Sequence, residues 1–196
     1  MSKGPGLSLS KGEKISLSKA ATDLGVANAL DNLMVGLGWD VNNFQGAAFD
    51  LDASVFMVDA NERVLNNSGF IFYGQPSDPA GSVVHSGDNK TGEGDGDDEK
   101  IKVVLSKVPA EIQKIVFTVT IYECKTRNQN FGQVKNAFIR VVDEASGQEL
   151  IRYDLTEDYS TQTALVVGEL YRHNGEWKFN AVGSGYPDDL GSFCNR

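Results

Sequence analysis

The sequence predicts a mainly all-β fold: an antiparallel β-sandwich of two sheets with one or two short helical turns. Short runs in which apolar and polar residues alternate recur along most of the chain, as in half-buried strands. Turn-forming residues separate these runs about every 8–12 residues, which is typical of sandwich domains. The Asn-Gly pair at 174–175 lies between two such runs and indicates a two-residue hairpin loop.

The predicted strands begin at the N-terminus. Residues 7–12 and 15–19 alternate around a Gly turn and predict two short strands, and residues 20–31 form a less regular connection. In the next strand, 33–40, the glycines Gly36 and Gly38 indicate a bulge or a close approach of another group to the backbone.

The strand at 49–58 divides its side chains between two faces, because neighbouring residues of a strand point in opposite directions. Asp50 and Asp52 therefore share one face, where like charges call for a counter-ion or for solvent. Phe56 and Val58 lie on the same face and indicate that it is partly covered. Later strands are predicted at 69–73, 82–85, 101–105, 114–123, 137–142, 149–155, 163–172 and 177–179.

Several segments break this pattern. Residues 109–112 predict one helical turn, 126–134 a polar connection, and 183–196 an irregular end. Cys124 is expected in a strand-like run and Cys194 near the chain end, and two such thiols predict reduced cysteines rather than a disulfide framework.

Length and charge limit the class of protein. With 196 residues the chain can bury a sizeable core, and residues 1–196 are predicted to form one domain. A net charge of −9 argues against nucleic-acid binding, which needs a basic face. No apolar run reaches the roughly twenty residues of a membrane span, and no signal peptide is recognisable, so a cytoplasmic location is expected.

The run Gly87–Glu99 is the most unusual stretch: six carboxylates alternate with glycines between two strands. Two carboxylates about 4 Å apart repel by ~1 kcal/mol in water and by several times that near a protein surface. The run is therefore either an open, solvated acidic turn or a loop closed around a cation.

The donor atoms favour calcium. Ca²⁺ takes roughly six to eight oxygen ligands, which carboxylates, Asn, Thr and glycine-exposed carbonyls supply. The run contains no His or Cys for zinc, copper or iron. Its spacing does not match an EF-hand, since Lys90 and Glu93 occupy the third and sixth positions counted from Asp88.

Taken together, these segments resemble the TerD family of bacterial tellurium-resistance and stress-response proteins. The resemblance rests on the acidic run and on five further stretches: Leu-Ser-Lys-Gly at 9–12, Val-Gly-Leu-Gly-Trp-Asp at 35–40, Phe-Asp-Leu-Asp-Ala-Ser at 49–54, Gln-Asn-Phe-Gly-Gln-Val followed by Asn-Ala-Phe-Ile-Arg-Val within 129–141, and Glu-Leu-Tyr-Arg-His-Asn-Gly-Glu-Trp-Lys-Phe at 169–179. It spans nearly the whole chain.

The resemblance implies a calcium-binding β-sandwich that acts in resistance to tellurite and other chemical stress. Its partners would be other Ter-type proteins, at the inner face of the membrane, and no enzymatic activity is implied. The implied ligands are Asp50, Asp52, Asp88, Asn89, Glu93, Asp97, Asp98 and Glu99, with Thr91 and Gly94 as carbonyl donors. Because these oxygens exceed one calcium shell, two neighbouring Ca²⁺ ions are expected.

Three alternatives remain open at this point. A metal-assisted stress-response enzyme would use His85 or His173 as a base, although no nucleophile motif accompanies either. Tellurite chemistry through Cys124 and Cys194 lacks a Cys-x-x-Cys arrangement. A cyclic-nucleotide-binding module would need an Arg-centred phosphate site, for which the sequence gives no sign.

Overall fold

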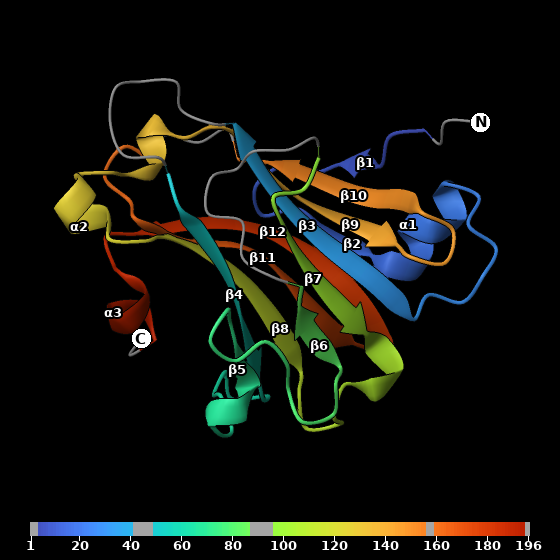
Figure 1. Ribbon diagram of the computed structural model, residues 1–196. Helices are drawn as coiled ribbons and strands as arrows, with labels where there is room; N and C mark the ends of the chain where they lie inside the picture. Colours follow the sequence, from blue (N-terminus) through green and yellow to red (C-terminus); the bar gives the residue numbers. More distant parts are fainter. Residues whose placement is uncertain (1–3, 41–48, 87–95, 156–158, 195–196) are drawn as a thin grey trace.

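The computed structural model describes residues 4–40, 49–86, 96–155 and 159–194, and its strands pack as two sheets face to face (Figure 1). Within these residues each sheet has six strands, and every pairing is antiparallel except that of β1 with β10. Sheet A runs β1 (Leu7–Ser8), β10 (Gln148–Asp154), β9 (Lys135–Asp143), β3 (Asn32–Asp40), β7 (Glu99–Val104), β6 (Val83–His85). Sheet B runs β2 (Lys14–Ser16), β12 (Glu176–Tyr186), β11 (Ala164–His173), β8 (Lys114–Ile121), β4 (Leu51–Val58), β5 (Phe70–Ile71). The predicted sandwich is confirmed.

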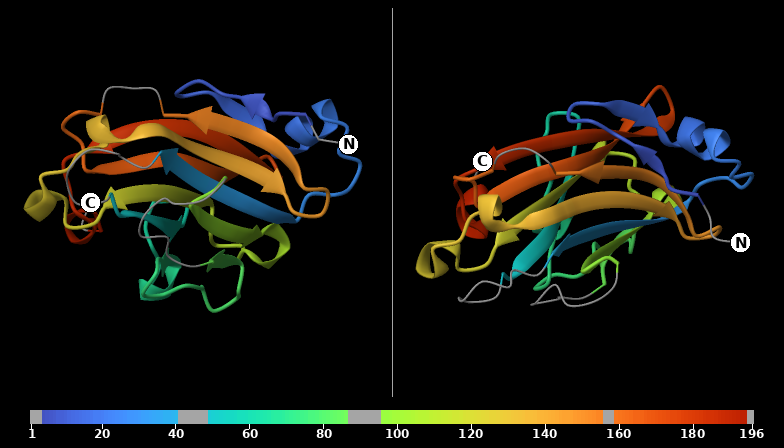
Figure 2. Two further views of the ribbon diagram at one scale, coloured as in Figure 1. Left: turned by 45° about the horizontal axis from the view of Figure 1, so that its top comes forward. Right: turned by 90° about the horizontal axis from the view of Figure 1, so that it is seen from above.

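The helices are short and lie at the margins of the sandwich. Figure 2 places α1 and α3 at opposite ends of it. In the described part of the chain the α-helices are α1 (Leu17–Asp23), α2 (Cys124–Arg127) and α3 (Leu190–Phe193), and the 3₁₀ turns are η1 (Asn67–Gly69), η2 (Leu105–Lys107) and η3 (Phe131–Gln133). None of these helices has the length and hydropathy of a membrane span.

The core fills the space between the two sheets. Side chains of one parity along each strand point inward, so Val35 of β3, Ile139 of β9 and Phe117 of β8 are fully buried. The hairpin prediction is also confirmed, because β11 and β12 are joined by Asn174 and Gly175, whose φ angles are 52° and 78°. Positive φ at both central residues gives the turn a twist that matches its strands.

The N-terminal prediction is partly wrong. The two short strands are present, and they lie in different sheets: β1 joins β10 in sheet A, whereas β2 joins β12 in sheet B. The strand predicted to continue to residue 19 instead becomes α1 at Leu17. The Ser16 side chain caps this helix, and Ala20 and Ala21 pack on the same face as Leu17, a helical spacing that the shorter Leu-Ser alternation concealed.

Three further segments differ from the sequence-based prediction. Cys124 begins the short helix α2 instead of continuing a strand, and it is buried and unbonded to Cys194. Residues 109–112, expected to form one helical turn, form a tight turn outside any helix, in which the Ile112 amide donates to the Pro109 carbonyl. The expected irregular end contains the last part of β12, which ends at Tyr186, and then α3.

The buried ring of Phe117 provides a test of the sheet packing. Phe117→Ala is expected to lower the free energy of unfolding by about 3–5 kcal/mol, because it removes a fully buried ring and leaves a cavity. Urea unfolding with EDTA present measures this without a metal contribution. Leu65→Ala, whose side chain is half exposed, is the matched control and should change stability by no more than about 0.5 kcal/mol. Similar losses in both variants would contradict the packing described.

Candidate metal site at the end of the acidic loop

The described end of the acidic run lies where the first residues of β4 and of β7, which belong to different sheets, come together. β4 of sheet B and β7 of sheet A are joined there by a hydrogen bond from the Ala53 amide to Glu99 Oε2, at 2.5 Å. On the other side of the loop, the Ser86 amide donates to the Lys100 carbonyl at 2.9 Å. The structure therefore fixes the chain on both sides of residues 87–95.

Of the two carboxylates in the predicted strand at 49–58, Asp52 lies on the face that the alternation implied, whereas the strand itself begins only at Leu51. Leu51 and Ala53 point into the core, and Asp52 points to the outer face of sheet B, where it is 7% exposed. Further along that face the hydroxyls of Ser54 and Thr118 are 2.7 Å apart. Asp50 precedes the strand, with Oδ2 4.0 Å from Arg127 Nη1.

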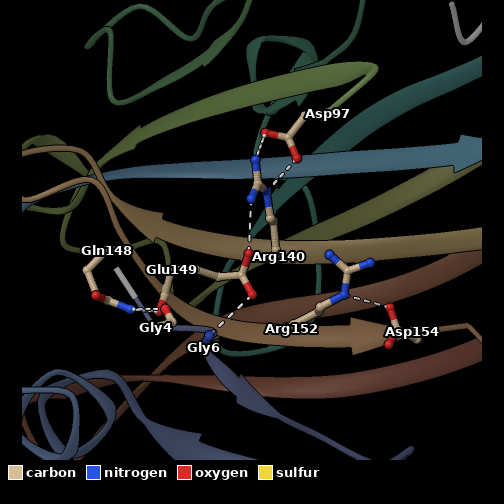
Figure 3. Close-up of polar contacts among 8 residues, drawn as sticks. All are labelled: Gly4, Gly6, Asp97, Arg140, Gln148, Glu149, Arg152 and Asp154. Carbon is tan, nitrogen blue, oxygen red and sulfur yellow. Dashed lines mark hydrogen bonds and ion pairs between the residues drawn. The ribbon is translucent and has the colours of Figure 1, made fainter. Parts of the chain in front are cut away.

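Asp97 is held by an arginine that the sequence analysis did not single out (Figure 3). Arg140 of β9 donates from Nε to Asp97 Oδ1 at 2.6 Å and from Nη2 to Oδ2 at 2.9 Å. The Asp97 side chain is completely buried, and its carboxylate raises the pKa of Arg140. Arg140 Nη1 donates at 3.0 Å to Glu149 of β10, so the guanidinium is fixed from two sides.

Asp98 turns toward the end of β3. Its Oδ2 accepts a hydrogen bond from the Trp39 amide at 2.8 Å, and its own amide donates to the Leu37 carbonyl at 2.8 Å. The pKa of Asp98 is raised mainly by burial, and repulsion from Asp97 and Asp40 adds to the effect. A cation near this carboxylate would relieve both penalties.

Glu99 points into the space between the sheets. It is the first residue of β7, pairs with the inward-facing Leu37, and is 2% exposed. Besides accepting from the Ala53 amide, its Oε2 lies 3.6 Å from Nε2 of the buried His85. Asp97 and Glu99 are only two residues apart, but Asp97 pairs with Arg140 of β9, whereas Glu99 contacts Ala53 of β4 and His85 of β6.

The glycines of the 35–40 stretch make room for these contacts. A Cβ at Gly36 would lie 2.2 Å from Asp97 Cγ, and one at Gly38 would lie 2.5 Å from the Phe138 ring. Val35 and Leu37 on either side fill the core. The predicted close approach is therefore confirmed. The pairing with β9 shifts register between Gly38 and Asp40, but the extra residue lies in β9, between Lys135 and Phe138, so the alternative prediction of a bulge in β3 is wrong.

The described residues do not complete a metal site by themselves. Within residues 4–40, 49–86, 96–155 and 159–194, no three His, Cys, Asp or Glu side chains are grouped so as to hold an ion. Asp50, Asp52, Asp98 and Glu99 are the hard oxygen donors that fit Ca²⁺, whereas both oxygens of Asp97 are bonded to Arg140. The predicted ligands Asp88, Asn89, Thr91, Glu93 and Gly94 lie outside the described residues.

Comparison with known proteins identifies the family to which this fold belongs. A family model described as the TerD domain matches residues 6–196. The chain belongs to the TerD family. The resemblance predicted from the sequence is therefore confirmed, and it associates the chain with proteins of tellurium resistance and stress response.

Two relatives of this TerD-family chain match almost end to end. It is 55% identical over 188 residues to the tellurium resistance protein TerD of Serratia marcescens, which covers 96% of the chain and 95% of the relative. It is 56% identical over 185 residues to general stress protein 16U of Bacillus subtilis (strain 168), covering 94% and 93%. A crystal structure of a TerD homologue from Streptomyces coelicolor A3(2) superposes with a TM-score of 0.70 at 23% identity, over 84% of this chain and 95% of that one, and supports the fold.

Glu99 offers a test of the contact between the sheets. Glu99→Ala is expected to lower the free energy of unfolding by about 1–3 kcal/mol, because it removes the acceptor of a buried amide. Glu99→Gln keeps an acceptor oxygen and should cost less. Urea unfolding in EDTA measures both, and equal losses would mean that the hydrogen bond from Ala53 does not matter.

Proposed function

We propose that this TerD-family protein binds Ca²⁺ through its acidic loop and acts as a calcium-dependent binding or scaffold module in resistance to tellurite and other chemical stress. The proposed donors are Asp50, Asp52, Asp98 and Glu99 together with the oxygens of residues 88–94, and two ions share them. Bound calcium closes the loop, neutralises its charge and fixes a surface for another Ter-type protein, at the inner face of the membrane.

The observation that supports calcium best is the burial of carboxylates at the loop's end. An ordinary acidic turn keeps its charges in water, but two of the proposed donors, Asp52 and Glu99, are only 7% and 2% exposed, and burial raises the pKa of a third, Asp98. Burying a charge is unfavourable unless it is paired. The fold therefore draws this end of the loop inward, where the remaining negative charge calls for a cation.

The two histidines support a binding role rather than a catalytic one. His85 is 4% exposed and lies against Glu99, in a position that offers a substrate no access. His173 is exposed at the tip of the β11–β12 hairpin, and no described side chain forms an ion pair with it. A general base needs to lie within hydrogen-bond reach of a bound substrate.

A calcium titration followed by calorimetry and NMR tests the proposal. The wild type is expected to bind Ca²⁺, and Asp98→Asn should weaken the affinity by about tenfold or more, because a ligand charge is lost. Asp23→Asn is the matched control: Asp23 pairs with Lys19 on the exposed face of α1, so its loss should leave calcium affinity unchanged. No heat and no spectral change on adding calcium to the wild type would rule out the proposed function.

Metal removal gives a second test. At a free Ca²⁺ concentration of a hundred times the dissociation constant, each independent site adds about 2.7 kcal/mol to the free energy of unfolding. The melting temperature should therefore fall when EDTA replaces Ca²⁺. Mg²⁺ is the control ion, since it demands a smaller octahedral site and should stabilise the protein less.

A further inference from the structure

Arg140 and Asp97 form the best-defined ion pair next to the acidic loop (Figure 3). Both carboxylate oxygens of Asp97 accept from the guanidinium, at 2.6 and 2.9 Å. A planar guanidinium that makes two parallel bonds to one carboxylate fixes its orientation as well as its position. Each Asp97 oxygen keeps a second lone pair, but a cation bound there would have to share the carboxylate with the guanidinium.

The pair lies on the outer face of sheet A. Ile139 and Val141 point into the core on either side of Arg140, so the arginine points outward, and it is paired across the strands with Gly36. The Asp97 carboxylate rests on Gly36, at a position that a single methyl group would fill. Glu99 points to the inner face instead, so the sheet separates the two carboxylates.

The arginine is itself held in place. Glu149 Oε2 accepts from Arg140 Nη1 at 3.0 Å, and Glu149 Oε1 accepts from the Gly6 amide at 3.4 Å. These bonds extend the contact from the loop through β9 and β10 to the N-terminal segment. A calcium ion that bound Asp97 here would also lie next to the positive guanidinium, which repels it.

We propose that Arg140 is a positioning residue of the calcium site, and that Asp97 is the loop's anchor instead of one of its ligands. The inference rests on the proposed calcium function. The pair fixes Gly96–Asp98 on the outer face of sheet A, so that Asp98 reaches the end of β3 and Glu99 enters the sandwich. Calcium then meets a loop whose end is already ordered, and less conformational entropy is lost on binding.

The two possible roles of Asp97 predict opposite results for Arg140→Gln. If Asp97 is a ligand, Arg140 competes with calcium for it, and removing the arginine tightens calcium binding. If Asp97 is the anchor, removing the arginine loosens the end of the loop and weakens binding. We expect a dissociation constant about tenfold higher with the number of bound ions unchanged, a coupling of the usual size between two sites.

The experiment compares calcium titrations of the wild type, Arg140→Gln, Asp97→Asn and the double variant by calorimetry. The double variant should lose no more affinity than either single variant, because both substitutions break the same contact. Arg152→Gln is the matched control, since Arg152 lies on the same face of the neighbouring strand β10 but pairs with Asp154. Unchanged or tighter binding in Arg140→Gln, or fewer bound ions in Asp97→Asn, would overturn the proposal.

A metal-free measurement separates this inference from the proposed function. In EDTA, hydrogen exchange at the amides of residues 97–99 should be at least about tenfold faster in Arg140→Gln than in the wild type, while exchange in β11 is unchanged. Gly36→Ala should do the same without altering any charge, because its methyl group displaces the Asp97 carboxylate. If the wild type binds no calcium, the proposed function fails, but hydrogen exchange still tests whether Asp97 anchors the loop. Unchanged exchange in both variants would overturn the anchor role of Asp97.

Discussion

Burial of two carboxylates at the end of the acidic loop is the constraint on which the surrounding structure depends. Asp97 leaves water only because Arg140 pairs with both of its oxygens, and Glu99 does so against the Ala53 amide and His85. A buried carboxylate that loses its partner is left with an uncompensated charge, which is strongly unfavourable. The strands around the loop must therefore be placed so that both carboxylates keep their partners. This constrains the relative positions of β3, β7 and β9 and the contact of β4 with β7.

The same constraint explains the composition of β3. Large side chains on its inner face, Val35 and Leu37, fill the core, while glycines on its outer face admit a carboxylate and an aromatic ring. The ring is that of Phe138, which also lies under the Arg152 guanidinium, 3.8 Å from its carbon. Asp97 lies about sixty residues after Gly36 in the sequence, and Phe138 about a hundred after Gly38, yet both pack on β3.

These contacts bear on how the proposed calcium-binding loop would act as a module. Ser86 is bonded to β7 on one side of the loop, and Arg140 holds Asp97 on the other, so only the segment between them has to respond to the ion. Loops positioned by a rigid scaffold are common binding elements. A change confined to this segment would alter the surface offered to a partner without disturbing the core.

The sequence by itself determined the sandwich, most of its strands, the β11–β12 hairpin, the close approach at Gly36 and Gly38 and the family, because side-chain period and turn residues are local properties. It also gave the donor atoms that favour calcium. It could not reveal that Asp97 meets Arg140, that Glu99 bridges the sheets, or that β1 and β2 belong to different sheets. Those features depend on strand order and register across long sequence separations, and only the tertiary structure decides which outward-facing charges become neighbours.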